Sequence, residues 1–513
     1  MLHPSSGTNC YNVTIQIRFL LACREEFVTE LQHGIPTMPL ARASHCPFVL
    51  RTPILPKNPE GERMNIERSS TLLRRSLLTA AILAAGFAGA AHAADDTLTW
   101  NGITLYGTVD VDVSYQNHGA PLSQDFYTGL EYLIQKNSNK SITSIGPNGL
   151  SQSKIGLKGK EEIADGLAGI FNLEMGFLPT SGNLADALKS LTHNNGVPLS
   201  QQTTAADGSR AGQFFNGPAY AGLESKEWGT LTVGRHNTLL ADAIGKYDPQ
   251  GASYAFSLIG FSGTTAGGGD TEDVRLDDSV KYNLKHDWLR FGLLYQFGKT
   301  DSSPGEAWQG DIGIDYEGLS VDGLFAHKKD AISASSLSAA QVATAGVPRN
   351  ALAATISDNT SYTLAASYTA GPWKVFGGFE HIKFENPSLP LTTPFTGLGG
   401  YDFYFANNAA FPHDKKLEVS WVGLKYLLSK DFDVTGAYYH LNQNAFGAVK
   451  CSNTSAGNCS GDEDVFSFKF DYRFSKRWDA YAGAMYSKVS DGLANGFINT
   501  SVWSPTVGVR FQF

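Results

Sequence analysis

The sequence lacks the features that define several common protein classes. Its 513 residues contain only five cysteines and no apolar run of the about 20 residues that a transmembrane helix needs. Neither the hydrolase motif G-x-S-x-G nor the zinc motif H-E-x-x-H occurs. These absences exclude a helical membrane protein and weigh against an enzyme. Glycine, with 54 residues, and aromatic side chains, at 12%, are well represented.

An export signal lies inside the chain, at residues 64–93. Two arginines precede an apolar core that ends in the small-x-small cleavage site AHA. Residues 94–513 are therefore predicted to form the mature protein. Because a signal of this kind normally begins the chain, residues 1–63 are interpreted as a mis-called N-terminal extension. A genuine cytoplasmic extension is the alternative.

Removal of these segments makes the protein more acidic and leaves two cysteines. Residues 1–93 contain nine Lys or Arg and six Asp or Glu, so 31 basic residues remain against 43 acidic ones. An acidic exported protein has no electrostatic basis for binding nucleic acid. Cys451 and Cys459 are eight residues apart, and an oxidising compartment favours a loop disulfide over a metal site.

Alternation of apolar and polar residues indicates strands with lipid on one side and water on the other. The terminal segment VGVRFQF alternates in this way, and in LYGTVDVDVSY valines alternate with Asp110 and Asp112. Strands can satisfy their backbone groups in hydrocarbon only as a closed barrel. The sequence thus predicts an all-β transmembrane antiparallel β-barrel of sixteen strands. They are expected near residues 103–116, 150–161, 167–178, 212–224, 230–237, 274–284, 288–298, 308–316, 320–328, 360–369, 373–384, 416–428, 432–442, 464–474, 478–488 and 503–513.

The connections between these segments also alternate. Short turns, such as Gly371-Pro372, follow one strand, and longer loops rich in Gly, Ser and Asn follow the next. Five of the eight tryptophans lie beside short turns or just before the first strand: Trp100, Trp228, Trp288, Trp373 and Trp478. This placement predicts an aromatic girdle at one rim of the barrel.

Four segments together resemble the general diffusion porins of Gram-negative bacteria, in particular those of β-proteobacteria. They are LYGTVDVDVSY, SQSKIGLKGKEEIADGLAGIFNLEMGF, GPAYAGLESKEWGTLTVGR and the terminal VGVRFQF, and the resemblance extends over residues 94–513. It implies a homotrimer in the outer membrane. It also implies that the terminal aromatic residues Phe511 and Phe513 are an assembly signal that the outer-membrane assembly machinery reads.

The resemblance also implies that the third long loop folds into the lumen and narrows it. In this sequence that loop spans residues 238–272, and its first acids are Asp242 and Asp248. The loop lacks the Pro-Glu-Phe-Gly-like turn that is frequent in the family. The geometry of the constriction is therefore less determined than the fold.

Alternation selects basic residues for the inner wall. Lys154 lies opposite Ile155 and Leu157 in phase, and it occupies the place where porins that this chain resembles often carry an arginine. Arg275 and Lys281 are inward by the same argument. These bases are candidates for a pore constriction, where acids on the loop and bases on the wall create a transverse field. The alternative is that they hydrate an ordinary lumen wall.

Arg235 does not follow simple alternation. Counting from Leu231 and Val233 turns it toward lipid, where an arginine at the bilayer midplane costs about 2–4 kcal/mol. A β-bulge at Gly234 would turn it inward. The family resemblance places this arginine in the pore as a further constriction base.

Acidic residues fall into two groups. Asp110, Asp112 and Glu174 face the lumen by the phase of their strands. A second group could bind a divalent cation, but we expect it to be solvated and predict no metal site. Its members are Asp270, Glu272, Asp273, Asp277 and Asp278.

These features predict an outer-membrane porin that lets ions and small hydrophilic solutes diffuse through a water-filled channel with a charged constriction. Outer-membrane lipid and lipopolysaccharide are its expected surroundings, and no cofactor is expected. One alternative is a channel specific for a sugar or an organic acid. Another is an adhesive or receptor barrel that uses the aromatic segment 401–411. The acidic net charge favours cations, but much of it lies in loops and leaves the ion preference open.

Overall fold

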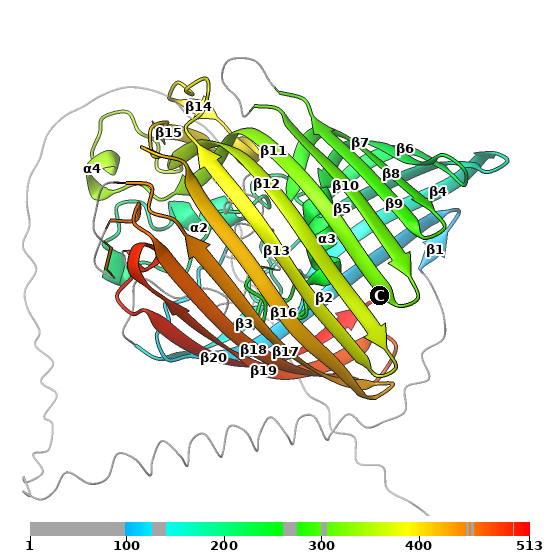
Figure 1. Cartoon of the computed structure of the whole chain (residues 1–513). Coiled ribbons are helices and arrows are strands. Elements are labelled where there is room, and N and C mark those ends of the chain that lie inside the picture. Colours follow the sequence, from blue (N-terminus) through cyan, green and yellow to red (C-terminus); the bar gives the residue numbers. More distant parts are fainter. Residues whose placement is uncertain are drawn as a thin grey trace, which may run out of the picture. The chain divides into compact units, whose positions relative to one another are not determined.

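The chain forms a closed antiparallel barrel of sixteen strands (Figure 1). The computed structural model describes residues 98–125, 140–259, 274–298, 305–447, 451–452, 456–495 and 497–513. The barrel strands are β2 (Ile103–Gln116), β4 (Lys154–Ala164), β5 (Leu167–Gly176), β6 (Ala219–Ser225), β7 (Gly229–Asn237), β8 (Arg275–His286), β9 (Leu289–Gln296), β10 (Ala307–Tyr316), β11 (Leu319–Ser335), β12 (Leu352–Ala370), β13 (Trp373–Glu385), β16 (Lys415–Ser429), β17 (Phe432–Gln443), β18 (Gly461–Arg473), β19 (Trp478–Val489) and β20 (Ser501–Gln512). All sixteen predicted strands are confirmed.

Smaller elements lie in and between the loops. The short strands are β1 (Thr99–Trp100), β3 (Ile142–Pro147), β14 (Phe395–Thr396) and β15 (Asp402–Asn407). The helices are α2 (Ala187–Thr192), α3 (Leu239–Tyr247) and α4 (Ala339–Val342), with 3-10 turns at Leu199–Gln201, Leu398–Gly400 and Asp491–Ala494. Within the described ranges, no helix has the length and hydropathy needed to cross a membrane.

Side chains alternate along each barrel strand, as the sequence predicts. In β18, for example, Ser467 and Lys469 are buried inside the barrel, whereas Phe466, Phe468 and Phe470 are exposed on its outer face. Successive residues of a strand point to opposite faces of a sheet, so this pattern gives an apolar exterior and a polar interior. The five girdle tryptophans are likewise exposed and lie at the end of the barrel that carries the short turns.

The two ends of the chain close the ring. β20 pairs with β2, from Thr108 opposite Gln512 to Ser114 opposite Thr506. The backbone N–H and C=O of Phe513 then bond to Gly107, at 3.0 and 2.9 Å. β1 folds back and pairs with the first residues of β2, beyond the point where β20 ends. The closure that the alternation of the terminal segment predicts is confirmed.

The third long loop (238–274, described to residue 259) folds into the barrel. Thr238 caps α3, which packs inside against β9 to β13. Tyr247, at the end of the helix, is fully buried, and its carbonyl accepts a hydrogen bond from the indole of Trp421 at 3.1 Å. The loop then follows the inner wall, where Gln250 donates to Ser467 at 2.9 Å. The infolding predicted by resemblance is present in the described part of the loop.

β11 and β12 are longer than the sequence predicts, because apolar and polar residues do not alternate in residues 329–335 and 352–359. Strand β15 pairs with β12 in parallel, and loop residues cover the other side. Ile356 of β12 and Phe403 of β15 are consequently fully buried in a second apolar core. A strand covered on both faces loses the period of two. The predicted strand therefore ends at residue 328 for β11 and begins only at residue 360 for β12. The aromatic segment 401–411 contributes to this packing.

A disulfide closes the loop between β17 and β18. Cys451 and Cys459 are bonded, with their Cα atoms 5.3 Å apart. The sulfur of Cys451 accepts a hydrogen bond from the backbone N–H of Ser460 at 3.0 Å. The bridge therefore ties a loop at the end of the barrel opposite the short turns.

Candidate functional site

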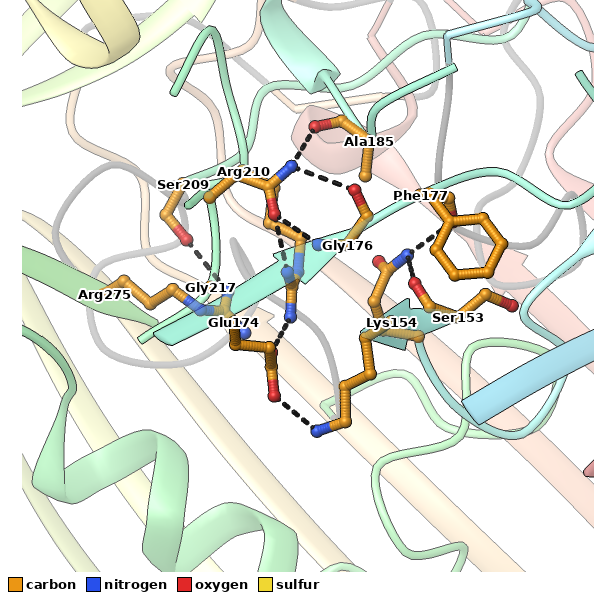
Figure 2. A network of polar contacts seen from close by, with 12 residues as sticks. Ser153, Lys154, Glu174, Gly176, Phe177, Ala185, Ser209, Arg210, Gly217 and Arg275 are labelled. Carbon is orange, nitrogen blue, oxygen red and sulfur yellow. Dashed lines mark hydrogen bonds and ion pairs between the residues drawn. The ribbon is translucent and has the colours of Figure 1, made fainter. Parts of the chain in front are cut away.

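An ionic chain joins two strands of the wall to the second long loop (177–218). Lys154 begins β4, and its Nζ lies 2.7 Å from Oε2 of Glu174 on β5 (Figure 2). Oε1 of Glu174 accepts a hydrogen bond from Arg210 at 2.8 Å. The side chains of Glu174 and Arg210 are 5% and 2% exposed, whereas that of Lys154 is 33% exposed. Lys154 is therefore the member of the chain that water and solutes reach.

Arg210 is held in place by the loop that carries it. Its guanidinium donates to the side-chain oxygen of Asn216 at 2.8 Å, and the amide of Asn216 donates to the carbonyl of Ala185 at 2.8 Å (Figure 2). Tyr254 of the third loop also hydrogen-bonds to Arg210. The second and third loops thus meet at this ionic chain. Sequence reasoning missed Arg210, because a lone arginine in an irregular loop has no phase that would point it inward.

Arg235 reaches the interior through the predicted bulge. The register between β7 and β8 shifts between Gly234 and His236, and Gly234 has a φ of 138°. The guanidinium of Arg235 donates to Asp277 at 2.6 Å and to the carbonyl of Gly217 at 3.1 Å. It also donates to the backbone carbonyls of Ser209 and Asn216. Arg235 therefore fastens the second loop to the wall.

Lys281 and Asp242 are directly paired. The ammonium group of Lys281, on β8, lies 2.5 Å from the carboxylate of Asp242 and 2.9 Å from the carbonyl of Asn237. Asp242 lies in the first turn of α3, and its side chain is 53% exposed. A wall base thus contacts the acid of the infolded helix. Arg275, the first residue of the same strand, donates to the hydroxyl of Ser209 at 3.3 Å.

The remaining predicted acids are buried. Asp110 accepts from the backbone N–H groups of Leu150 and Ser151, both at 2.8 Å, and from the hydroxyl of Tyr481 at 2.6 Å. Asp112 accepts from the hydroxyl of Ser114 at 2.6 Å. Both carboxylates face inward, as alternation predicts, but they lie beneath the first loop and out of contact with water.

Asp248 holds the third loop rather than lining the opening. It is buried and accepts hydrogen bonds from the hydroxyl of Tyr439 and the backbone N–H of Ala252, both at 2.6 Å. Burial raises the pKa of this carboxyl above its ordinary value. The sequence predicts Asp248 as an acid of the charged constriction. In the structure it attaches the third loop to β17.

The acidic group at the start of β8 is only partly described. Asp270, Glu272 and Asp273 lie outside the described residues, and Asp277 pairs with Arg235 at 2.6 Å. Within the described ranges, no three His, Cys, Asp or Glu side chains are grouped closely enough to hold a metal ion.

Two lysines and a tyrosine complete the exposed part of the wall. Nζ of Lys154 and Nζ of Lys158 lie 5.8 and 5.6 Å from the centre of the Tyr106 ring. The tyrosine hydroxyl donates to Asn172 at 2.7 Å. The contacts described above involve six bases and three carboxylates. The bases are Lys154, Lys158, Arg210, Arg235, Arg275 and Lys281, and the carboxylates that pair with them are Glu174, Asp242 and Asp277.

The chain is similar to known proteins in sequence and in fold. A family model described as Gram-negative porin matches residues 79–492. The chain belongs to the Gram-negative porin family. An outer membrane porin protein of Bordetella pertussis is 28% identical over 455 residues, which cover 86% of this chain and all of that protein. Outer membrane porin protein 32 of Delftia acidovorans is 25% identical, with 70% and 86% coverage.

Solved structures show the same fold. The anion-selective porin from Comamonas acidovorans superimposes with a TM-score of 0.54 at 18% identity, over 80% of this chain and 99% of the other. A trimer form of OmpT from Vibrio cholerae gives a TM-score of 0.50 at 13% identity, over 80% and 99%. Together with the family match, the fold establishes an outer-membrane β-barrel porin, a channel type rather than an enzyme type.

Proposed function

We propose that the porin lets ions and small hydrophilic solutes diffuse passively through the gap between the third loop and the wall of β2 to β8. The observation that carries this proposal is the course of the loop. From α3 to Phe256 it packs along β9 to β19, so the lumen is narrowed beside the wall that carries Lys154 and Lys281. Lys154 and the exposed Asp242 then border a water-filled path. The chemistry is charge steering, with no reacting group and no cofactor.

The proposed ion preference is for anions. The contacts beside the proposed opening involve six bases and three carboxylates, and the more accessible bases are the half-buried Lys154 and the exposed Lys158. An ion in the opening responds to charges within a Debye length, about 8 Å at physiological salt, so loop acids farther away count little. The local excess therefore outweighs the acidic net charge of the chain. The anion-selective porin of Comamonas acidovorans shares the scaffold on which such a preference is built.

The assembly is proposed to be a homotrimer surrounded by outer-membrane lipid and lipopolysaccharide. The similarity to a trimer form of OmpT supports this stoichiometry at the level of the fold. The apolar exterior supports contact with lipid, and the terminal residues Phe511 and Phe513 remain the candidate signal for the assembly machinery.

Conductance in a planar bilayer distinguishes the proposed function from two alternatives, a channel specific for one solute and an adhesive or receptor barrel. The purified porin should give stepwise currents that rise linearly with salt concentration and do not saturate at low concentrations of any one solute. A channel specific for one sugar or organic acid would instead be blocked by micromolar amounts of that solute. An adhesive or receptor barrel would pass no current, and that result would contradict the proposed function.

A further inference from the structure

A second basic feature lies on the inner wall, away from the charges that border the opening. Lys374 on β13 is the register partner of Lys425 on β16. On β17, Thr435 is the partner of both Lys425 and Lys469, and Lys469 lies on β18. These strands are consecutive in the barrel (Figure 1). Partners in a register lie side by side on neighbouring strands, so the three lysines form a row across the wall. We call this the lysine row.

A recess of about 280 Å³ lies between the lysine row and the third loop. Its rim includes the short turn at Gly371 and Pro372, which places it at the periplasmic end of the barrel. The third loop contributes Lys246, which brings a fourth ammonium group to the recess. The volume is slightly below the about 300 Å³ at which pockets for drug-sized ligands begin, and it suits a molecule of one ring.

The positive charge of the recess is only partly neutralised. Lys425 pairs with Asp433 at 3.1 Å, but Asp433 also receives Arg473 at 2.6 Å. Lys246 lies 3.2 Å from Asp315, which also binds Arg290. Lys246 also lies 3.7 Å from Asp322, which binds Arg290 as well, so these two cations share two carboxylates. Among the side chains that line the recess itself, four are lysines and one, Asp248, is a carboxylate, and this excess favours an anion.

Lys374 is the least neutralised member of the row. It forms no ion pair with any residue that the structure describes, and its ammonium group lies 4.7 Å from the centre of the Phe376 ring. The carboxylate that lines the recess, Asp248, is turned away from it toward Tyr439 and the backbone of Ala252. Lys374 is therefore placed to bind a carboxylate from solution.

Apolar residues form much of the remaining lining of the recess, beside Thr369 and Gln250. They include Pro249, Pro372, the buried Phe376 and Leu427. A bare inorganic anion would gain nothing from these surfaces and would lose hydration beside them. A ring that carries a carboxylate would fill the apolar part and place its charge against the lysines.

We propose that this recess is a binding site for small organic anions in which a carboxylate is attached to an aromatic or other apolar ring. The site lies on the periplasmic side of the third loop, and it would retain such solutes briefly as they cross. The inference rests on the proposed function, because it needs an open channel through which the solute arrives.

Benzoate and phthalate are suitable probes in planar bilayers. Each should reduce the open-channel current saturably at millimolar concentrations. Benzyl alcohol, which has the ring but no charge, should have no effect, and inorganic phosphate should need a severalfold higher concentration. Block by phosphate at the same concentration as phthalate, or no saturable block by either carboxylate, would overturn the inference. Absence of any current in the wild-type protein would overturn the proposed function instead.

Charge substitutions locate the block. Lys374→Gln should raise the half-blocking concentration of phthalate by roughly 1.5- to fivefold, the range for one partly exposed charge contact. Lys425→Gln is a second variant of the same row and should act in the same direction. Lys430→Gln is the matched control, because Lys430 lies on a periplasmic turn with its side chain 90% exposed and does not line the recess. Equal block of the control and the two row variants would place the anion elsewhere.

Discussion

At the scale of single residues, the last residue of the chain, Phe513, is held by contacts with Gly107 on the first barrel strand. The backbone of Phe513 forms two hydrogen bonds with Gly107, and its ring lies over that glycine. A Cβ atom on Gly107 would lie 2.4 Å from Cζ of Phe513. Only glycine therefore leaves room for the terminal ring at this point of the seam. The ring also stacks on Phe511, whose neighbour across the sheet is Trp478.

Deletion of Phe513 should lower the yield of folded barrel severalfold. The deletion removes both hydrogen bonds to Gly107, each with a net contribution of about 0.5–1.5 kcal/mol, together with the ring contacts. Folded protein can be quantified by the mobility of unheated samples on gels. Phe513→Leu keeps the backbone bonds and should retain more folded protein than the deletion. Full yield after deletion would show that the residue serves neither closure nor assembly.

Residue directions could be predicted from sequence, but their ionic partners could not. Alternation places Lys154 and Glu174 inside, and they are indeed paired there at 2.7 Å. The third member of that chain, Arg210, comes from an irregular loop in which no period exists. Burial depth was also out of reach, since Asp110 is covered by backbone groups of the first loop, which is distant in sequence.

At the scale of elements, the third loop is the part that folds into the barrel and narrows its lumen. It is attached to the wall by a few polar contacts, among them Tyr439 to Asp248 and Trp421 to Tyr247. Polar anchors of this kind fix orientation as well as position, because each needs its own geometry. The loop should therefore become more mobile when one anchor is removed.

Tyr439→Phe should increase the frequency of brief current interruptions in single-channel recordings. The substitution removes one of the donors to the buried carboxylate of Asp248, which keeps Ser257 and Ala252, and it weakens the attachment of the loop by about 0.5–1.5 kcal/mol. Tyr438→Phe is the matched control, because Tyr438 donates to Asp464 away from the third loop. Equal interruption rates in the two variants would show that Tyr439 does not anchor the loop.

Strands were predictable wherever one face meets lipid and the other meets water. The extensions of β11 and β12 were not, because Ile332 and Ile356 lie in a core that loops cover from both sides. The same reason hides β15, whose Phe403 is fully buried. Local sequence carries a period only when the environment alternates, and loop packing removes that alternation.

At the scale of the whole molecule, the protein carries two charge distributions that point in opposite directions. The chain has a net charge of −9, with many of its acids in loops. The contacts beside the proposed opening, which include Lys154 and Lys281, involve six bases and three carboxylates. On the proposed path, permeating ions would pass these bases at contact distance, and salt would screen the loop acids.

The central claim is that the charges beside the opening decide which ions pass, and the zero-current potential across a tenfold KCl gradient tests it most directly. The account predicts a potential whose sign shows chloride to be the more permeant ion, by roughly threefold or more, as a local potential of about one kT or more would give. Lys154→Glu should move that potential toward potassium. A wild-type potential that shows potassium preference would contradict the account.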